Sequence, residues 1–200
     1  MITSCQKYNH KLDFHRNFIK KHKSILNQHN VEMIIIMGGQ PDPNISDVVF
    51  LDAPDDYKNL PKKVYEGFRY IYENKPDVEA IVKIDDDVHI SPCAIINLRH
   101  VSWIPYWGLQ LGHIFVDNTV FPVYHRFDDP NVEVIPLKKC IHPIGHVYSL
   151  NKHAIELLLK HKKEMYYGYH EDAMVGKILN DYNIFPVKIE KLESLFKLVE

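Results

Sequence analysis

The sequence has no long apolar run. The longest unbroken one, Met33–Met37, is far shorter than the ~20 residues of a membrane-spanning helix. The opening segment, Met1–Lys7, also lacks the apolar stretch of a secretory signal. We therefore expect a protein with no membrane span.

Cysteine is scarce as well. Cys5, Cys93 and Cys140 are odd in number, far apart in sequence and without the spacing of a metal site. Isolated thiols suit a reducing compartment, because disulfides accumulate mainly in oxidising ones. The cysteine content therefore predicts a cytoplasmic protein.

The sequence also lacks a surplus of positive charge. Lys and Arg number 24 against 26 Asp and Glu, which gives a formal net charge of -2. Proteins that bind nucleic acids or anionic membranes usually carry a basic surplus, so neither partner is expected. The basic cluster at Lys20, Lys21 and Lys23 is typical of a solvated helix face. The 13 histidines include no His-Glu-x-x-His pairing that would indicate a zinc site.

The sequence does contain a regular alternation of strand and helix patterns over 200 residues, a length that suits one domain. Apolar residues recur every three or four positions over Leu60–Tyr72, which predicts a helix. Ser91 and Asn151 suit the N-caps of two further helices, and Glu171 opens another. The expected strands cover residues 32–37, 48–51, 80–84, 109–116, 132–135 and 184–189. This alternation predicts an α/β sandwich with a mixed, largely parallel sheet flanked by helices.

Three adjacent carboxylates, Asp85, Asp86 and Asp87, follow the apolar strand pattern directly. They repel one another unless a cation is bound, and hard oxygen ligands suit Mg²⁺ or Mn²⁺. The end of a strand in an open α/β sheet is also where ligands bind. A random acidic triplet is more often a solvated turn, but the abrupt change from apolar residues to acids favours a metal site. The triplet alone does not separate sugar transfer from phosphoryl transfer.

A second acidic pair, Glu171-Asp172, stands at the predicted start of a helix. Acids in a first turn complement the helix dipole, so a purely structural role is equally compatible with them. The functional interpretation makes Asp172 a general base beside Tyr166, Tyr167 and Tyr169, whose rings suit a sugar acceptor.

Taken in order, several segments resemble the motifs of one enzyme family. Residues 55–63, Gly67 and Lys83–Asp87 are similar to the DxYxNLTxK…G…KxDDD pattern of the β-1,3-galactosyltransferase and Fringe-like family, glycosyltransferase family 31. Residues 145–149 resemble its G-x-x-Y-x-x-S segment and residues 171–176 its EDVxxG motif. The ordered set covers residues 15–187.

The resemblance implies a GT-A fold and an inverting, metal-dependent transfer. The donor would be a UDP-sugar with Mn²⁺ or Mg²⁺, and the acceptor a hydroxyl of a glycan or glycoprotein. Residues 1–100 would form the nucleotide- and metal-binding half of a single domain, and residues 101–200 the acceptor-binding and catalytic half. The sequence has no membrane anchor or paired cysteines, which fits a microbial or virus-encoded enzyme best. We expect it in the cytoplasm, which would be the host cytoplasm for a viral enzyme.

The resemblance also assigns residues. Asp85 and Asp86 would lie near ribose and metal, Asp87 would ligate the metal directly, and Asp172 would be the base. Glu171 takes a supporting or capping role. The full set of expected donor-binding residues is Thr3, Ser4, Arg16, Asp55, Lys63, Lys83, Asp85 and Asp86, with Asp85 and Asp87 at the metal.

One departure and two alternatives remain. The family's third metal ligand is a histidine well after the EDVxxG motif, and no histidine follows His170. Another residue or water would fill that position, or the chain is one domain of a longer protein. A metal-dependent phosphotransferase or nucleotidyltransferase is an alternative, although no P-loop or kinase signature supports it. A non-catalytic sugar-binding module is the other, and the presence of both Asp87 and Asp172 argues against it.

Overall fold

The computed structural model describes residues 1–117, 138–167 and 170–198. Its main feature is a seven-stranded sheet in the order β10-β6-β9-β4-β1-β2-β3. The strands in that order are Val187–Lys188, Tyr106–Gly108, Val147–Asn151, Ala80–Asp85, Ile2–Thr3, Ile35–Met37 and Val49–Phe50. Only β9 of these strands runs antiparallel to its neighbours, β4 and β6. The predicted mixed, largely parallel sheet is confirmed.

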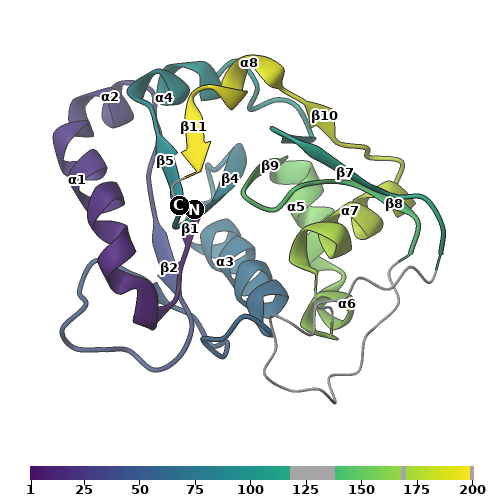
Figure 1. The fold of residues 1–200 in the computed structure, drawn as a ribbon, viewed down its shortest axis with the longest axis horizontal. Helices are drawn as coiled ribbons and strands as arrows, with labels where there is room; N and C mark the ends of the chain where they lie inside the picture. The colour runs from purple at the N-terminus through teal and green to yellow at the C-terminus, as the bar shows by residue number, and fades with distance from the viewer. Residues whose placement is uncertain (118–137, 168–169, 199–200) are drawn as a thin grey trace.

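Helices cover both faces of this sheet (Figure 1). One face packs against α3 Leu60–Asn74, α5 Lys152–Leu159, α6 Lys162–Tyr167 and α7 Glu171–Asp181. The other packs against α1 Asp13–Lys21, α2 Lys23–Gln28, α4 Pro92–Leu98 and α8 Glu190–Glu193. Because successive strand residues point to opposite faces, Tyr106 enters the first core and Trp107 the second. The result is the three-layered α/β sandwich that the alternating pattern predicts.

Two small strand pairs and a short helix complete the described elements. A 3₁₀ helix, η1 Gln6–Leu12, links β1 to α1. β5 Val88–Ile90 pairs with β11 Phe196–Leu198, and β7 Leu111–Ile114 pairs with β8 Cys140–Pro143, both antiparallel. None of the described helices combines the length and the apolar character needed to cross a bilayer.

The predicted helix starts are confirmed. Ser91 accepts a hydrogen bond from the Cys93 amide at the start of α4, and Asn151 accepts one from Ala154 at the start of α5. These are the N-cap bonds that satisfy otherwise unpaired backbone donors.

The strand boundaries are less well predicted. The expected strand 184–189 is reduced to Val187–Lys188, because Pro186 has no N–H to donate to the ladder. Of the expected strand 109–116, only β7 is a strand, and it is not part of the main sheet. The adjacent β6, which does belong to the main sheet, was not predicted. The segment 132–135 lies outside the described residues.

The strand order of the sheet identifies one edge as a candidate ligand-binding site. From β1 the chain proceeds through β2 and β3 on one side, and β4 pairs on the other side. Ligands of open α/β sheets bind where the strand order reverses, beyond the carboxyl ends of the strands. Thr3 is in register with Asp85 across β1 and β4, so the aspartate triplet lies at this reversal point.

The contact between α7 and β8 leads to a test of the packing. A Cβ at Gly176 would lie 2.5 Å from the Cβ of His142 and 2.8 Å from the backbone oxygen of Ile141. Alanine improves helix propensity by about 1 kcal/mol, but overpacking against such rigid atoms costs about 1–3 kcal/mol. We expect Gly176→Ala to lower the free energy of unfolding by up to about 2 kcal/mol in urea titrations.

Gly67→Ala is the matched control. The atoms nearest its new Cβ would be the flexible ends of Ile36 and Met1, which can move aside, so its loss should be smaller. A Gly176→Ala protein as stable as the parent would show that α7 does not need the glycine.

Candidate active site

Hydroxyl groups at the end of β1 hold two members of the aspartate triplet. Thr3 Oγ1 donates to Asp85 Oδ1 over 3.2 Å, and Ser4 Oγ donates to Asp86 Oδ2 over 2.6 Å. On the other side, the imidazole of the buried His15 contacts the backbone oxygen of Asp86 through Nε2 at 3.2 Å. The parallel pairing of β1 with β4 therefore orients the carboxylates.

The ammonium of Lys83 is buried behind the triplet. Its Nζ bonds to Asp85, donates to the backbone oxygen of Gly145 over 2.6 Å, and lies 3.7 Å from Glu171 Oε2. Burial alone would lower the pKa of Lys83, but Asp85 and Glu171 raise it above its ordinary value. The group therefore stays charged and joins β4 to the start of α7. The role at the donor that the family resemblance implies for Lys83 stays a prediction, and the side chain is 1% exposed.

Glu171 is the other buried partner of this ammonium. The hydroxyl of Tyr148, on the adjacent β9, donates to Glu171 Oε1. Burial raises the pKa of Glu171 to about 7, although Lys83 acts in the opposite direction. The supporting role expected for Glu171 is therefore an internal ion pair with Lys83.

A third cluster combines Asp85, Asp87 and His146. One ligand atom from each lies within 4.8 Å of the others. His146 Nδ1 lies 3.6 Å from Asp85 Oδ2, and Asp85 raises the pKa of His146. Burial acts to raise the pKa of Asp85, but Lys83 and His146 lower it below its usual value. His146 is not among the predicted ligands, because the family pattern places its histidine ligand after the EDVxxG motif and therefore after His170.

Asp172 occupies the first turn of α7 beside the same segment of chain. Its Oδ1 accepts from the Ala173 amide over 2.8 Å, and its Oδ2 lies 3.5 Å from His142 Nδ1. Burial tends to raise the pKa of Asp172, but His142 lowers it below its ordinary value. A Cβ at Gly145 would lie 3.4 Å from Asp172 Oδ2, so Asp172 flanks the turn that carries His146.

Two further expected donor-binding residues are held together by an ion pair. Lys63 Nζ, buried on α3, lies 2.7 Å from Asp55 Oδ1 and donates to the backbone oxygen of Ser4 over 2.9 Å. Asp55 also accepts from the amides of Gln6 and Gly38, over 2.6 and 3.0 Å. The ion pair between Lys63 and Asp55 therefore holds the segments that follow β1 and β2.

Arg16 makes its contacts elsewhere. Its guanidinium forms two hydrogen bonds to the carboxylate of Asp47, over 2.6 and 3.1 Å, and also contacts Asn9 and Asp13. These bonds tie α1 to the loop before β3. The structure thus groups the other expected donor-binding residues around the end of β1 and gives Arg16 a different set of partners.

The aromatic residues expected beside Asp172 are only partly described. The hydroxyl of Tyr166 bonds to Glu66 on α3, and its ring packs edge-on against Tyr65 at 5.7 Å. The side chain of Tyr167 and all of Tyr169 lie outside the described residues.

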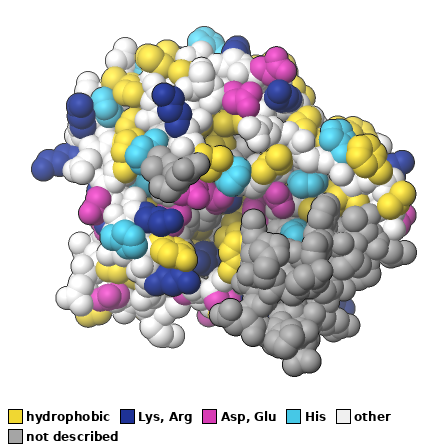
Figure 2. All heavy atoms as spheres, viewed as in Figure 1, with side chains coloured by type: hydrophobic (Ala, Val, Ile, Leu, Met, Phe, Trp, Pro, Cys, Tyr) yellow, Lys and Arg dark blue, Asp and Glu magenta, His cyan; other side chains and the backbone are white. Residues whose placement is uncertain are grey.

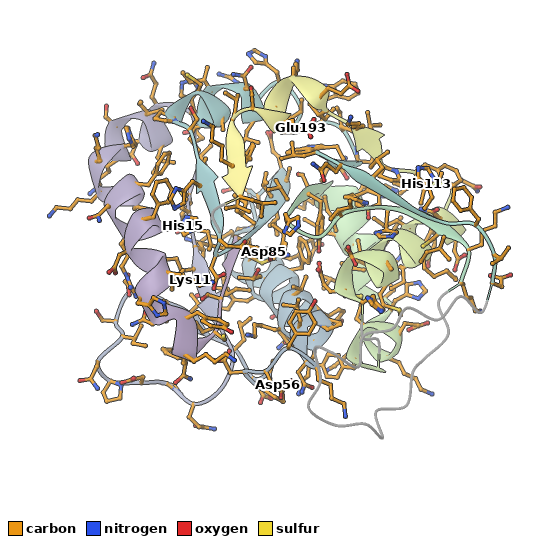
Figure 3. The ribbon with its side chains drawn as sticks, viewed as in Figure 1. Lys11, His15, Asp56, Asp85, His113 and Glu193 are labelled. Atoms are coloured by element: carbon orange, nitrogen blue, oxygen red, sulfur yellow. The ribbon has the colours of Figure 1, made fainter. Side chains whose placement is uncertain are left out.

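Figure 3 shows Asp85 at the middle of this view, with Lys11 and His15 on the side of η1 and α1. His113, on β7, lies far to the other side. In the space-filling view, acidic side chains and histidines gather around the centre of the same face (Figure 2). The described part of the face therefore brings carboxylates and imidazoles together at the carboxyl edge of the sheet.

An α/β sandwich with carboxylates at this edge is consistent with a GT-A-like glycosyltransferase domain. The family model described as "Galactosyltransferase" matches residues 35–190, and the chain therefore belongs to that family. The resemblance to glycosyltransferase family 31 is confirmed, and with it membership of a glycosyltransferase family. No curated protein matched the sequence.

The buried ammonium of Lys83 provides a stability test. Lys83→Met would leave Asp85 and Glu171 without their shared cation, and removing one partner of a buried ion pair costs about 3–5 kcal/mol. We expect a loss of that size in urea unfolding, partly restored by adding Glu171→Gln.

Lys177→Met is the control, because it removes a more exposed ion pair with Asp181. Pairs of that kind contribute at most about 1 kcal/mol. Equal losses for Lys83→Met and Lys177→Met would contradict the bridging role of Lys83.

Proposed function

We propose that the protein is a metal-dependent inverting glycosyltransferase that moves a hexose-type sugar from a UDP-sugar to a hydroxyl of a glycan or glycoprotein. The observation that carries the proposal is the turn Gly145-His146. On one side it brings His146 to Asp85 and Asp87, and on the other it lies against Asp172. A metal-binding cluster and a candidate base therefore adjoin one short segment.

The residues fit a divalent cation. Within the described part of the chain, the buried atom Asp87 Oδ1 has no hydrogen-bond partner, and His146 Nδ1 has only the 3.6 Å contact with Asp85 Oδ2, an arrangement that is costly unless something binds there. Two carboxylates and one imidazole are suitable donors for Mn²⁺, and the carboxylates for Mg²⁺. Bound there, the ion would supply positive charge against the diphosphate leaving group.

The protein's own groups would prepare and carry out the proton transfer. Thr3 and Lys83 hold Asp85 in place for the ion, and Ser4 holds Asp86. Asp172 would accept the proton of the acceptor hydroxyl. At the same time the hydroxyl oxygen would bond to the anomeric carbon, and the bond from that carbon to UDP would break. His142 holds the pKa of Asp172 below its ordinary value, so the carboxylate is ionised, as a base must be before it accepts a proton. Attack opposite the departing UDP inverts the anomeric centre.

His146 gives the first functional test. Replacing a residue of the second shell already costs about 10- to 100-fold in metal affinity, so losing a direct ligand should cost at least that. We expect His146→Ala to weaken Mn²⁺ binding about tenfold or more, measured by calorimetry and by Mn²⁺ electron paramagnetic resonance. Mg²⁺ binding should change less, because an imidazole is a softer donor than a carboxylate.

His113→Ala is the control, since His113 is exposed on β7 and far from Asp85 in Figure 3. Asp87→Ala should abolish both Mn²⁺ binding and sugar transfer with a nearly unchanged fold. Full activity in EDTA would contradict metal dependence.

Asp172 gives the second test. Loss of general-base catalysis typically costs about 100- to 10,000-fold, so Asp172→Asn should reduce kcat by that factor. Donor affinity should stay nearly intact, because UDP-sugar binding does not require the base. Asp181→Asn, at the exposed far end of α7, should keep parental kcat. An active Asp172→Asn enzyme would remove Asp172 from the role.

The products decide the reaction class. With Mn²⁺ and a panel of nucleotide sugars, the proposal predicts release of UDP and, from an α-linked donor, a β-linked product by NMR. Transfer of phosphate or of a nucleotide would instead support a phosphotransferase or nucleotidyltransferase. Binding without turnover would support a sugar-binding module. We further propose a cytoplasmic location, supported by the three free cysteines.

A further inference from the structure

His142 is a partly buried histidine that the proposed reaction leaves without a role. It lies on β8, where its Nδ1 is 2.9 Å from the backbone oxygen of Pro143 and 3.5 Å from Asp172 Oδ2. Its side chain is 12% exposed, against 22% for that of Asp172. An imidazole nitrogen therefore faces the candidate base from a separate strand.

Glycines on two sides make room for this imidazole. Gly112 is the partner of His142 in the β7–β8 pair, and a Cβ there would lie 2.7 Å from Cε1 and 2.8 Å from Nε2 of the ring. On α7, a Cβ at Gly176 would lie 2.5 Å from the Cβ of His142. A ring enclosed by a strand and a helix has little freedom to leave Asp172.

The available hydrogen-bond donors and acceptors determine what the contact between His142 and Asp172 can do. With its proton on Nδ1, the ring can donate toward both the Pro143 oxygen and Asp172 Oδ2. Asp172 Oδ1 is already held by the Ala173 amide. Asp172 Oδ1 then has a fixed donor and Oδ2 has the longer, shared contact with the imidazole, and each oxygen keeps a lone pair that can accept a proton from an acceptor hydroxyl.

The surrounding charges agree with this arrangement. Asp172 faces His142 from β8, Lys83 from β4 and Glu171 on its own helix. Burial opposes protonation of His142, but Asp172 and Glu171 raise its pKa above the ordinary value. Burial acts to raise the pKa of Asp172, and His142 and Lys83 outweigh it.

We propose that His142 is the positioning residue for Asp172: its Nδ1–H holds Oδ2 and keeps the carboxylate directed toward the acceptor hydroxyl. The catalytic part of this inference rests on the proposed function, whereas the contact itself does not.

The contact is tested without activity. The pKa of Asp172 is measured by ¹³C NMR titration of the side-chain carboxyls in the parent, His142→Leu and His142→Asn. Leu removes the donor, so the pKa of Asp172 should rise. Asn places an amide N–H near the position of Nδ1 but carries no charge, so it should keep only the part of the lowering that the hydrogen bond supplies. An unchanged pKa in His142→Leu would overturn the proposal whatever the enzyme does.

The catalytic part is tested by turnover. We expect His142→Leu to lower kcat about 10- to 100-fold, less than the full contribution of a general base. Donor KM and Mn²⁺ affinity should be unchanged, and His142→Asn should restore most of the activity. His113→Leu, on the partner strand β7, should keep parental kcat.

A double variant separates positioning from general damage to the fold. In an Asp172→Asn background, His142→Leu should cost less than about twofold in kcat, because there is no longer a base to position. A full additive loss there would overturn the proposal. If the parent transfers no sugar but the Asp172 pKa still responds to His142, the proposed function fails while the contact stands.

Discussion

The architecture of this site depends on one buried cation. Taking an ammonium out of water is costly, and the cost is offset only when opposite charges and hydrogen bonds surround it. Lys83 meets that condition through Asp85, Glu171 and the backbone oxygen of Gly145. These partners belong to β4, the start of α7 and the turn before β9. The electrostatic requirement of Lys83 therefore fixes three segments that are distant in sequence.

Once these segments are fixed, the carboxylates of the triplet differ in how many hydrogen bonds hold them. Asp85 and Asp86 accept hydrogen bonds from Thr3 and Ser4. Asp87 Oδ1 has no such partner among the described residues. Under the proposed function, this difference leaves Asp87 Oδ1 as the oxygen of the triplet that most needs a bound cation.

Small residues control the approach of α7 to the β7–β8 pair. Gly176 in the EDAMVG segment lets His142 and Ile141 come close to the helix, and Gly112 leaves room for the imidazole. In this chain Gly176 of the motif therefore acts through packing, and Asp172 near the start of the motif acts through charge. Together they bring Asp172 and His142 into contact across two separate elements.

The sequence by itself determined the α/β class, the helix starts at Ser91 and Asn151, and the family through its ordered motifs, because these depend on local periodicity, capping and spacing. It did not reveal that His146 lies beside Asp85 and His142 beside Asp172, nor that Lys83 forms an internal bridge. Their roles depend on strand pairing: β4 with β9 brings the Gly145 turn to Lys83, and β7 with β8 fixes His142. Such contacts join residues far apart in the chain, and only the tertiary structure decides them, since no local pattern encodes the distance between two side chains on different strands.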